Sequence, residues 1–348
     1  MVALGVVLHA IGGFAAGSFY IPFKKVRNWA WESYWLVGGI FSWIVMPWLV
    51  AALTVPQLLS LLGEAPPGAI VRSYVFGVLW GVGGLTFGLS MRYLGMSLGY
   101  AIALGFCAAF GTLVPPIFDG TFTELLSHRS GLTILAGVAV CLIGIAVCGR
   151  AGIAKERELS PDQKRASIKE FSFVKGLLVA IFAGVMSSCM AYGITAGKPI
   201  AELAVERGTP SLWQNSPVFI IVMGGGLTTN LIWCLILNIK NRSAGDYISV
   251  RDASLVGNYF FSALAGITWY FQFMFFGMGK TKMGRYDFSS WTLHMAFIIA
   301  FSNLWALVFH EWKGSSRRTF ATIVAGILVV VLSTIVIGLG NYLGAQGH

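Results

Sequence analysis

The feature that most constrains this chain is a series of long apolar runs. Ten stretches are rich in aliphatic and aromatic side chains, and a single crossing of a bilayer needs roughly 20 such residues. They lie near residues 3–22, 34–55, 70–91, 94–118, 131–150, 174–195, 215–238, 255–278, 288–310 and 318–341. Of the 348 residues only 11% are charged, against roughly 25% in soluble domains. The sequence therefore predicts an all-α integral membrane protein with ten transmembrane helices.

The basic residues are distributed unevenly between the predicted loops. Seventeen lysines and arginines fall in the connections that follow odd-numbered spans, and seven fall on the opposite side. Basic residues concentrate in cytoplasmic loops, so this asymmetry explains the net charge of +10 without a nucleic-acid partner. It predicts a multi-pass protein of the cell (inner) membrane with both termini on the periplasmic or external side.

The two halves of the chain resemble each other. Thr133–Gly137 (TILAG) recurs as Thr322–Gly326 (TIVAG), a shift of 189 residues, and the same shift relates Trp80 to Trp269. Five spans is an odd number, so the second copy must enter the membrane inverted. Inverted repeats around a central site are typical of secondary transporters.

The repeat sets the predicted domain organisation. We expect an N-terminal five-helix repeat at 1–150, a charged cytoplasmic linker at 151–173 and an inverted C-terminal five-helix repeat at 174–348.

Ionisable residues inside spans are candidates for function because burying charge in hydrocarbon is costly. Only His9 and His294 lie well inside predicted spans, each about six residues, or roughly 9 Å, below the outer end of its helix. Asp287, Trp291 and His294 follow at i, i+4 and i+7 and therefore share one helix face. We predict proton coupling by His294, His9 and Asp287, although the residues leave open whether His9 only joins two helices.

Aromatic and amide side chains near these histidines suggest a sugar site. A sugar needs an aromatic platform for its C–H face and polar groups for its hydroxyls. The predicted substrate-binding residues are Trp80, Trp269, Gln272, Trp291, Tyr270 and Asn230. The alternatives are packing against glycines for the deep tryptophans, a place in the interfacial aromatic belt for Trp291, and a link between helices for Asn230.

The sequence offers nothing typical of an enzyme. No nucleophile elbow, HExxH motif or phosphate-binding loop is present, and the five cysteines lie in apolar runs without metal-ligand spacing. We therefore predict no catalytic residues, metal or other cofactor. An integral-membrane transferase and a receptor are the rival classes, and the short loops favour neither.

Several segments resemble the L-rhamnose–proton symporter family of the drug/metabolite transporter superfamily. They are 9–12, 19–26, 31–32, 38–43, 88–97, 197–199, 222–226, 269–273, 286–287 and 291–295. The resemblance covers nearly the whole chain and implies ten helices in two repeats, with proton-coupled uptake of L-rhamnose by alternating access.

The third span departs from the family pattern. Gly84 and Phe87 stand where the familiar symporters have Asn and Tyr, and the stretch 191–195 also differs. Another sugar or small metabolite, or sodium coupling, therefore remains an open alternative. The sequence does not define an oligomeric state.

Overall fold

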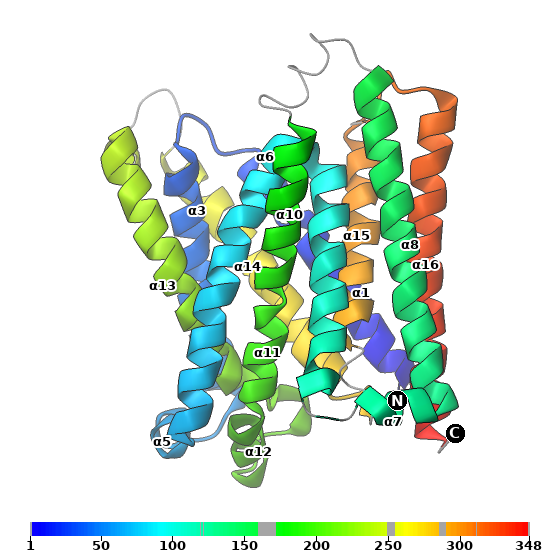
Figure 1. Ribbon diagram of the computed structural model, residues 1–348. Helices are drawn as coiled ribbons and strands as arrows, with labels where there is room; N and C mark the ends of the chain where they lie inside the picture. Colours follow the sequence, from blue (N-terminus) through cyan, green and yellow to red (C-terminus); the bar gives the residue numbers. More distant parts are fainter. Residues whose placement is uncertain are drawn as a thin grey trace. The chain divides into compact units, whose positions relative to one another are not determined.

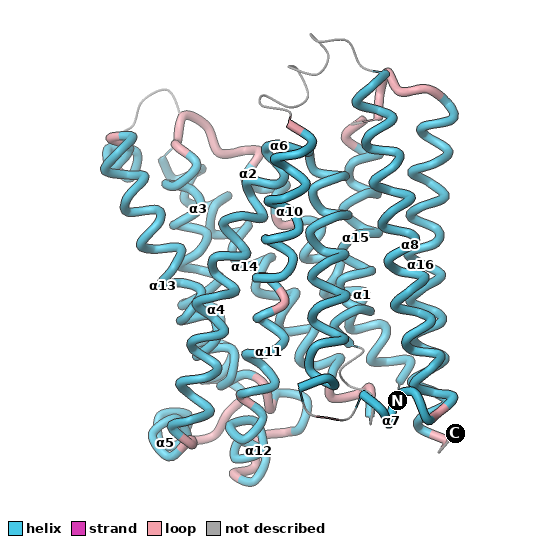
Figure 2. Tube along the Cα trace, viewed as in Figure 1, coloured by secondary structure: helices cyan, strands magenta, loops and turns pink. Residues whose placement is uncertain are grey.

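The computed structural model describes residues 2–118, 120, 122–158, 172–248, 255–284, 290–310 and 312–346. The described residues form helices and loops without a strand (Figures 1 and 2). The helices are α1 (Val2–Ser18), α2 (Tyr20–Phe23), α3 (Trp31–Ile40), the π-helix η1 (Phe41–Val45), α4 (Met46–Thr54), α5 (Leu58–Glu64), α6 (Pro67–Phe118), α7 (Phe122–Ser127), α8 (Arg129–Glu158), α10 (Phe173–Ser187), α11 (Cys189–Ala196), α12 (Lys198–Glu206), the 3₁₀ turn η2 (Ser211–Trp213), α13 (Ser216–Asn241), the 3₁₀ turn η3 (Ser243–Tyr247), α14 (Leu255–Lys280), α15 (Ser290–Val308) and α16 (Arg317–Ala345).

Nine helical segments among the described residues are long and apolar enough to cross a membrane. They match nine of the ten predicted spans, and the fourth predicted span, 94–118, contains the shorter apolar helix Ile102–Gly111. The prediction of an all-helical, multi-span membrane protein is confirmed. The count of ten and the arrangement as two repeats stay predictions.

The 52-residue helix α6 is not straight. A Cβ atom added at Gly99 would lie 3.1 Å from the Cα of Met91, whereas eight residues of straight helix rise about 12 Å. The chain therefore reverses direction between these two residues, where the sequence predicted a very short turn at Arg92.

The second span contains a π-helix, η1, between α3 and α4. Pro47 follows it, and a proline lacks the N–H for an α-helical bond and clashes with the carbonyl four residues earlier. That carbonyl belongs to Trp43, within η1. A wider turn at this point lets the span continue through the proline.

The chain divides into two compact units. Unit 1 comprises Met1–Gly17, Gly83–Ser188 and Gly279–His348, and unit 2 comprises Ser18–Val82 and Cys189–Met278. Each unit therefore contains segments from both halves of the sequence. The repeat boundaries at 150 and 174 stay a prediction; α8 continues to Glu158, and residues 159–171 of the predicted linker lie outside the described residues.

In unit 1, α8 and α16 run side by side (Figure 1). Glycines allow the close approach: a Cβ atom at Gly137 would lie 2.5 Å from the Ile337 side chain, and one at Gly326 would lie 2.6 Å from the Cys148 sulfur. Small residues at helix contacts are how membrane helices gain van der Waals packing.

In unit 2, two further glycine pairs bring helix backbones together. A Cβ atom at Gly266 on α14 would overlap the carbonyl of Gly38 on α3, and one at Gly225 on α13 would lie 2.9 Å from the carbonyl carbon of Gly77 on α6. These crossings leave room for the large aromatic side chains of the unit.

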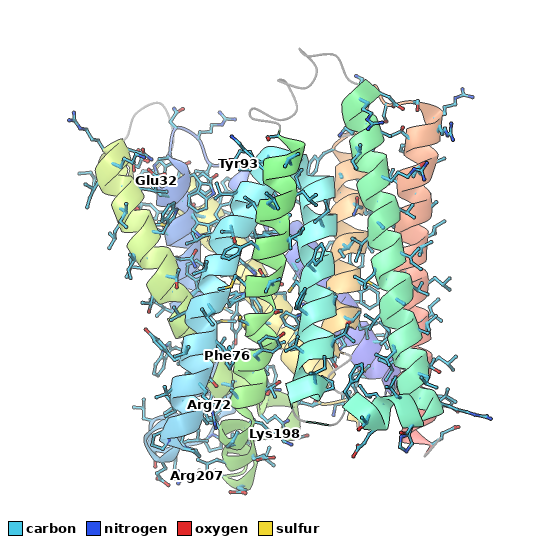
Figure 3. The ribbon with its side chains drawn as sticks, viewed as in Figure 1. Glu32, Arg72, Phe76, Tyr93, Lys198 and Arg207 are labelled. Atoms are coloured by element: carbon cyan, nitrogen blue, oxygen red, sulfur yellow. The ribbon has the colours of Figure 1, made fainter. Side chains whose placement is uncertain are left out.

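The charged residues of unit 2 lie toward its two ends. Figure 3 shows Arg72, Lys198 and Arg207 toward one end and Glu32 toward the other. Arg207 pairs with Glu64. This distribution leaves the middle of the helices apolar, as a bilayer requires.

Candidate functional site

The two intramembrane histidines meet in unit 1. His9 on α1 is 0% exposed and His294 on α15 is 1% exposed. Their ring centroids lie 5.8 Å apart, with an angle of 64° between the ring planes. The pairing on neighbouring helices gives the sequence prediction a concrete geometry.

Glycines bring the histidine helices together. A Cβ atom at Gly13 on α1 would lie 2.5 Å from the Phe297 side chain of α15, and one at Gly17 would lie 3.0 Å from the Ser302 nitrogen. A Cβ atom at Gly279, at the end of α14, would lie 3.0 Å from Nε2 of His9. Larger side chains at these positions would push the two imidazoles apart.

A buried imidazole pair can carry a proton. Each ring exchanges one proton between its neutral and cationic forms, and two cations this close together would repel each other strongly. The pair therefore suits a single transferable proton rather than two.

Trp291 lies three residues before His294 but does not face the membrane interface. It is 4% exposed, packs against Gly111, and its Nε1 donates a hydrogen bond to the Cys107 carbonyl at 3.1 Å. The indole therefore ties α15 to the second arm of α6. Asp287, the third member of the predicted face, lies outside the described residues.

An aromatic cluster surrounds Trp269 in unit 2. Its ring stacks on Phe19 at 4.5 Å and 29°, and Trp35, Trp43 and Trp80 lie at centroid distances of 5.1, 6.0 and 6.5 Å. The structure thus brings together Trp80 and Trp269, which the repeat relates. The Trp269 ring remains partly exposed, so it is not fully covered by its neighbours.

Three polar residues predicted for the sugar site also belong to unit 2. Gln272 is buried on α14 at 6% exposure. Asn230 bridges helices: its Oδ1 accepts from Trp35 Nε1 at 3.0 Å, and its Nδ2 donates to the Gly226 carbonyl at 2.8 Å. Tyr270 is fully buried, and its hydroxyl has no hydrogen-bond partner among the described residues.

Sequence reasoning missed the polar atoms of η1. The Ser42 hydroxyl and the Trp43 Nε1 are buried and have no hydrogen-bond partner within the described part of the chain. Ser262 on α14 shares this property. Buried polar groups are usually hydrogen-bonded, and π-helical turns are frequent at functional sites. A proline four residues after a tryptophan was the available signal.

Comparisons with known proteins come next. A family model described as "L-rhamnose-proton symport protein (RhaT)" matches residues 1–342. A protein of Yersinia pestis (strain Pestoides F) named L-rhamnose-proton symporter is 39% identical over 342 residues, covering 97% of this chain and 98% of its own. A protein of the same name from Yersinia pseudotuberculosis serotype O:1b (strain IP 31758) has the same identity and coverage.

Proposed function

The chain belongs to the L-rhamnose-proton symport protein (RhaT) family, and from this premise we propose that it imports L-rhamnose together with a proton. The family is one of transporters, not enzymes, and the long apolar helices make the chain a multi-pass membrane protein. The observation that carries the proposal is the match over 97% of the chain to relatives named for this activity.

The wider architecture is also proposed: ten spans in two inverted repeats, as in the drug/metabolite transporter superfamily. Contacts that recur under the repeat support it. Gly5 packs against Met283, and Gly176 packs against Leu94; the shift of 189 residues converts Leu94 into Met283.

The helix pair α8 and α16 supports the same arrangement. Gly137 contacts Ile337, and Gly326 contacts Cys148. The same shift converts each pair into the other, as expected for two helices related by a twofold axis. Such repeats provide two equivalent packings and hence alternating access.

The orientation belongs to the same proposal. Both termini lie on the periplasmic side of the inner membrane, because the connections with most lysines and arginines are then cytoplasmic. The Glu158 end of α8 and the loop before α16 lie on the cytoplasmic side in this arrangement.

We assign proton coupling to His294, with His9 as its partner and Asp287 nearer the outer mouth. The edge-to-face pair in unit 1 lies inside helices that are long enough to span the bilayer. An ionisable group at such depth indicates an ion pathway. His294 would take a proton from outside and release it inside.

We assign sugar binding to Trp80 and Trp269 as platforms, with Gln272 and Tyr270 for hydroxyl groups. Asn230 acts through Trp35, because its amide already bonds to that indole and to the α13 backbone. Trp291 likewise positions α15 through its bond to the Cys107 carbonyl.

Uptake of labelled L-rhamnose by proteoliposomes tests the function. One proton entering with a neutral sugar moves one charge, worth about 2.3 kcal/mol per 100 mV, which corresponds to roughly 50-fold accumulation. Uptake that ignores both the pH gradient and the membrane potential would refute proton symport. Accumulation that follows a sodium gradient instead would select the sodium-coupled alternative.

The histidine assignment needs its own variant. His294→Gln should abolish proton-driven accumulation while leaving sugar exchange without a gradient, because the substrate side chains are untouched. His128→Gln, at a residue that follows α7 outside the spans, is the matched control and should behave as the parent chain. Full accumulation by His294→Gln would remove His294 from the coupling mechanism without affecting the proposed function.

A further inference from the structure

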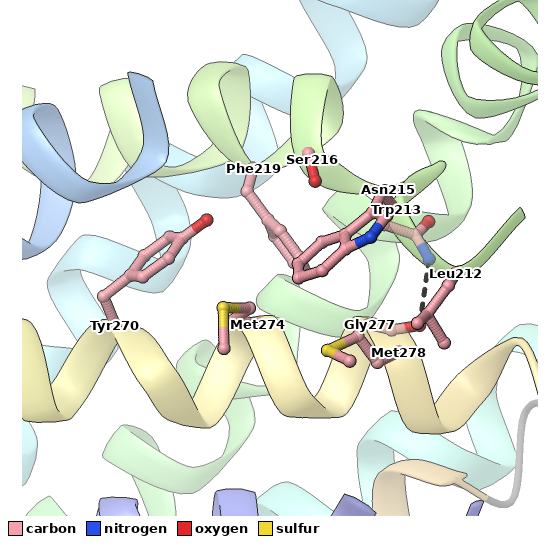
Figure 4. A pocket seen from close by; sticks show the side chains of 9 residues that line it. All are labelled: Leu212, Trp213, Asn215, Ser216, Phe219, Tyr270, Met274, Gly277 and Met278. Carbon is pink, nitrogen blue, oxygen red and sulfur yellow. Dashed lines mark hydrogen bonds between the residues drawn. The ribbon is translucent and has the colours of Figure 1, made fainter. Parts of the chain in front are cut away.

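A pocket in unit 2 includes residues that the proposed function leaves unused. It lies between α14, the first turn of α13 and the η2 turn that precedes α13 (Figure 4). It is lined by Leu212, Trp213, Asn215, Ser216, Phe219, Tyr270, Met274, Gly277 and Met278. Its empty space is about 190 Å³, including the part open to the surroundings. Pockets for drug-sized ligands measure about 300–1,000 Å³, so this one suits a smaller solute.

The Tyr270 hydroxyl is the unsatisfied group of this pocket. The residue is 0% exposed, and its oxygen has no hydrogen-bond partner among the described residues. Figure 4 shows the hydroxyl directed from α14 toward α13. A buried tyrosine hydroxyl usually finds a partner, so a bound hydroxyl group would complete this site.

The remaining lining has two kinds of surface. The Trp213 ring and the methionines Met274 and Met278 offer apolar contact, and Asn215 and Ser216 offer polar atoms. The Asn215 Nδ2 donates to the Gly277 carbonyl at 3.3 Å, which leaves its side-chain oxygen to accept from a ligand.

The chemistry of the lining selects a class of ligand. None of the nine lining residues carries a charge, so a charged solute would find no counter-ion there. A neutral molecule with hydroxyl groups on one side and C–H or methyl groups on the other matches both surfaces. A deoxyhexose has this character.

Two phenylalanines connect the pocket to the aromatic cluster. Phe219 lines the pocket and lies 6.5 Å from Phe273 between ring centroids. Phe273 in turn lies 5.4 Å from Trp80. A solute that moves from the pocket to the Trp80–Trp269 cluster must pass these rings.

We propose that this pocket is an entry subsite, in which the sugar binds before it reaches the Trp80–Trp269 cluster, and that Phe219 and Phe273 close the passage between them. The proposal rests on the proposed function and on the predicted orientation, in which the loop at 196–214 is external. It adds Trp213, Asn215 and the methionine wall to the residues that recognise substrate.

Thiol labelling at the methionine wall tests the subsite. The five native cysteines are buried, so the parent chain gives the background reaction with a membrane-impermeant maleimide. Met278→Cys should react from the outside, and saturating L-rhamnose should slow that reaction threefold or more, whereas equal D-sorbitol should not. Met274→Cys provides the same test if Met278→Cys fails to reach the membrane. Labelling from the inside only, or equal rates with and without L-rhamnose, would overturn the proposal.

A second variant tests the hydroxyl contact. Tyr270→Phe should raise the half-saturating L-rhamnose concentration about tenfold and leave the maximal rate near that of the parent. Tyr259→Phe is the control, because that hydroxyl already donates to the Tyr247 carbonyl away from the pocket. Unchanged saturation by Tyr270→Phe would refute the contact.

The two levels of the proposal fail differently. If the parent chain accumulates no L-rhamnose under a proton gradient, the proposed function fails. If it does so while L-rhamnose leaves the Met278→Cys labelling unprotected, the function stands and the entry subsite is wrong.

Discussion

Replacing Asn230 by leucine would remove the amide that joins three helices of unit 2. Its Oδ1 accepts from Trp35 Nε1 at 3.0 Å, and its Nδ2 donates to the Gly226 carbonyl at 2.8 Å and to the Gly81 carbonyl at 3.5 Å. Both Trp35 and Asn230 are 2% exposed. The leucine would therefore leave the Trp35 N–H buried without a partner.

The expected cost follows from that burial. An orphaned buried donor costs about 1–3 kcal/mol, whereas interhelical hydrogen bonds in membranes average about 0.6 kcal/mol. We expect Asn230→Leu to lower the free energy of unfolding by about 1–2 kcal/mol. Trp35→Phe removes the donor and should also destabilise, because it shrinks a buried ring. In the double variant neither partner is orphaned, so its loss should be about 1 kcal/mol smaller than the sum of the single losses.

Unfolding of the purified variants in mixed micelles, followed by denaturant titration, measures these differences. The control cycle pairs Asn230→Leu with Trp233→Phe, since Trp233 lies on the same helix but is 44% exposed, and it should be additive. Additivity within about 0.5 kcal/mol for the Trp35 cycle as well would refute the bond. A large loss of L-rhamnose affinity in Asn230→Leu with unchanged stability would instead make Asn230 a direct ligand.

Two further predictions concern packing and pH. Gly266→Ala should destabilise by about 1–3 kcal/mol because its Cβ atom would overlap the Gly38 carbonyl, while Gly63→Ala, with open space around it, should be neutral or slightly stabilising in the same unfolding assay. Backbone and side-chain hydrogen bonds from Ser316, with one from the Thr319 hydroxyl between them in size, hold the pKa of the exposed Glu158 below its usual 4.5. Its stabilising effect is therefore present at neutral pH and lost as the pH falls through the folded-state pKa, so the difference in melting temperature between the parent chain and Glu158→Gln should be constant near pH 7 and vanish in acid.

The spans could be predicted from sequence because the bilayer sets their length and polarity. Segments such as Arg317–Gly344 and Leu255–Lys280 coincide with predicted runs to within a few residues. The pairing of His9 with His294 was only suggested by their similar depth, and the structure gives it through glycine contacts between α1 and α15. Depth along a helix is readable from sequence, whereas the direction of a side chain around it is not.

The parts that were missed depend on tertiary contacts. The stacking of Phe19 on Trp269 joins residues 250 positions apart, and no local pattern marks it. The bonds of Trp291 to Cys107 and of Trp35 to Asn230 likewise depend on which helices are neighbours. Sequence reasoning found candidate side chains for the site but could not separate those that bind from those that hold other residues in place.

The repeat-related contacts make the position of the histidines informative. If Gly5 corresponds to Gly176, the same spacing relates His9 to Ala180, and the shift of 189 residues relates His294 to Gly105. Neither counterpart can take up a proton. The tryptophans behave differently, since Trp80 and Trp269 correspond and lie together. A symmetric scaffold with a one-sided titratable pair would let both packings present the same aromatic platform while only one half carries the proton, and this asymmetry is what a carrier needs to couple a neutral sugar to a proton in a defined direction.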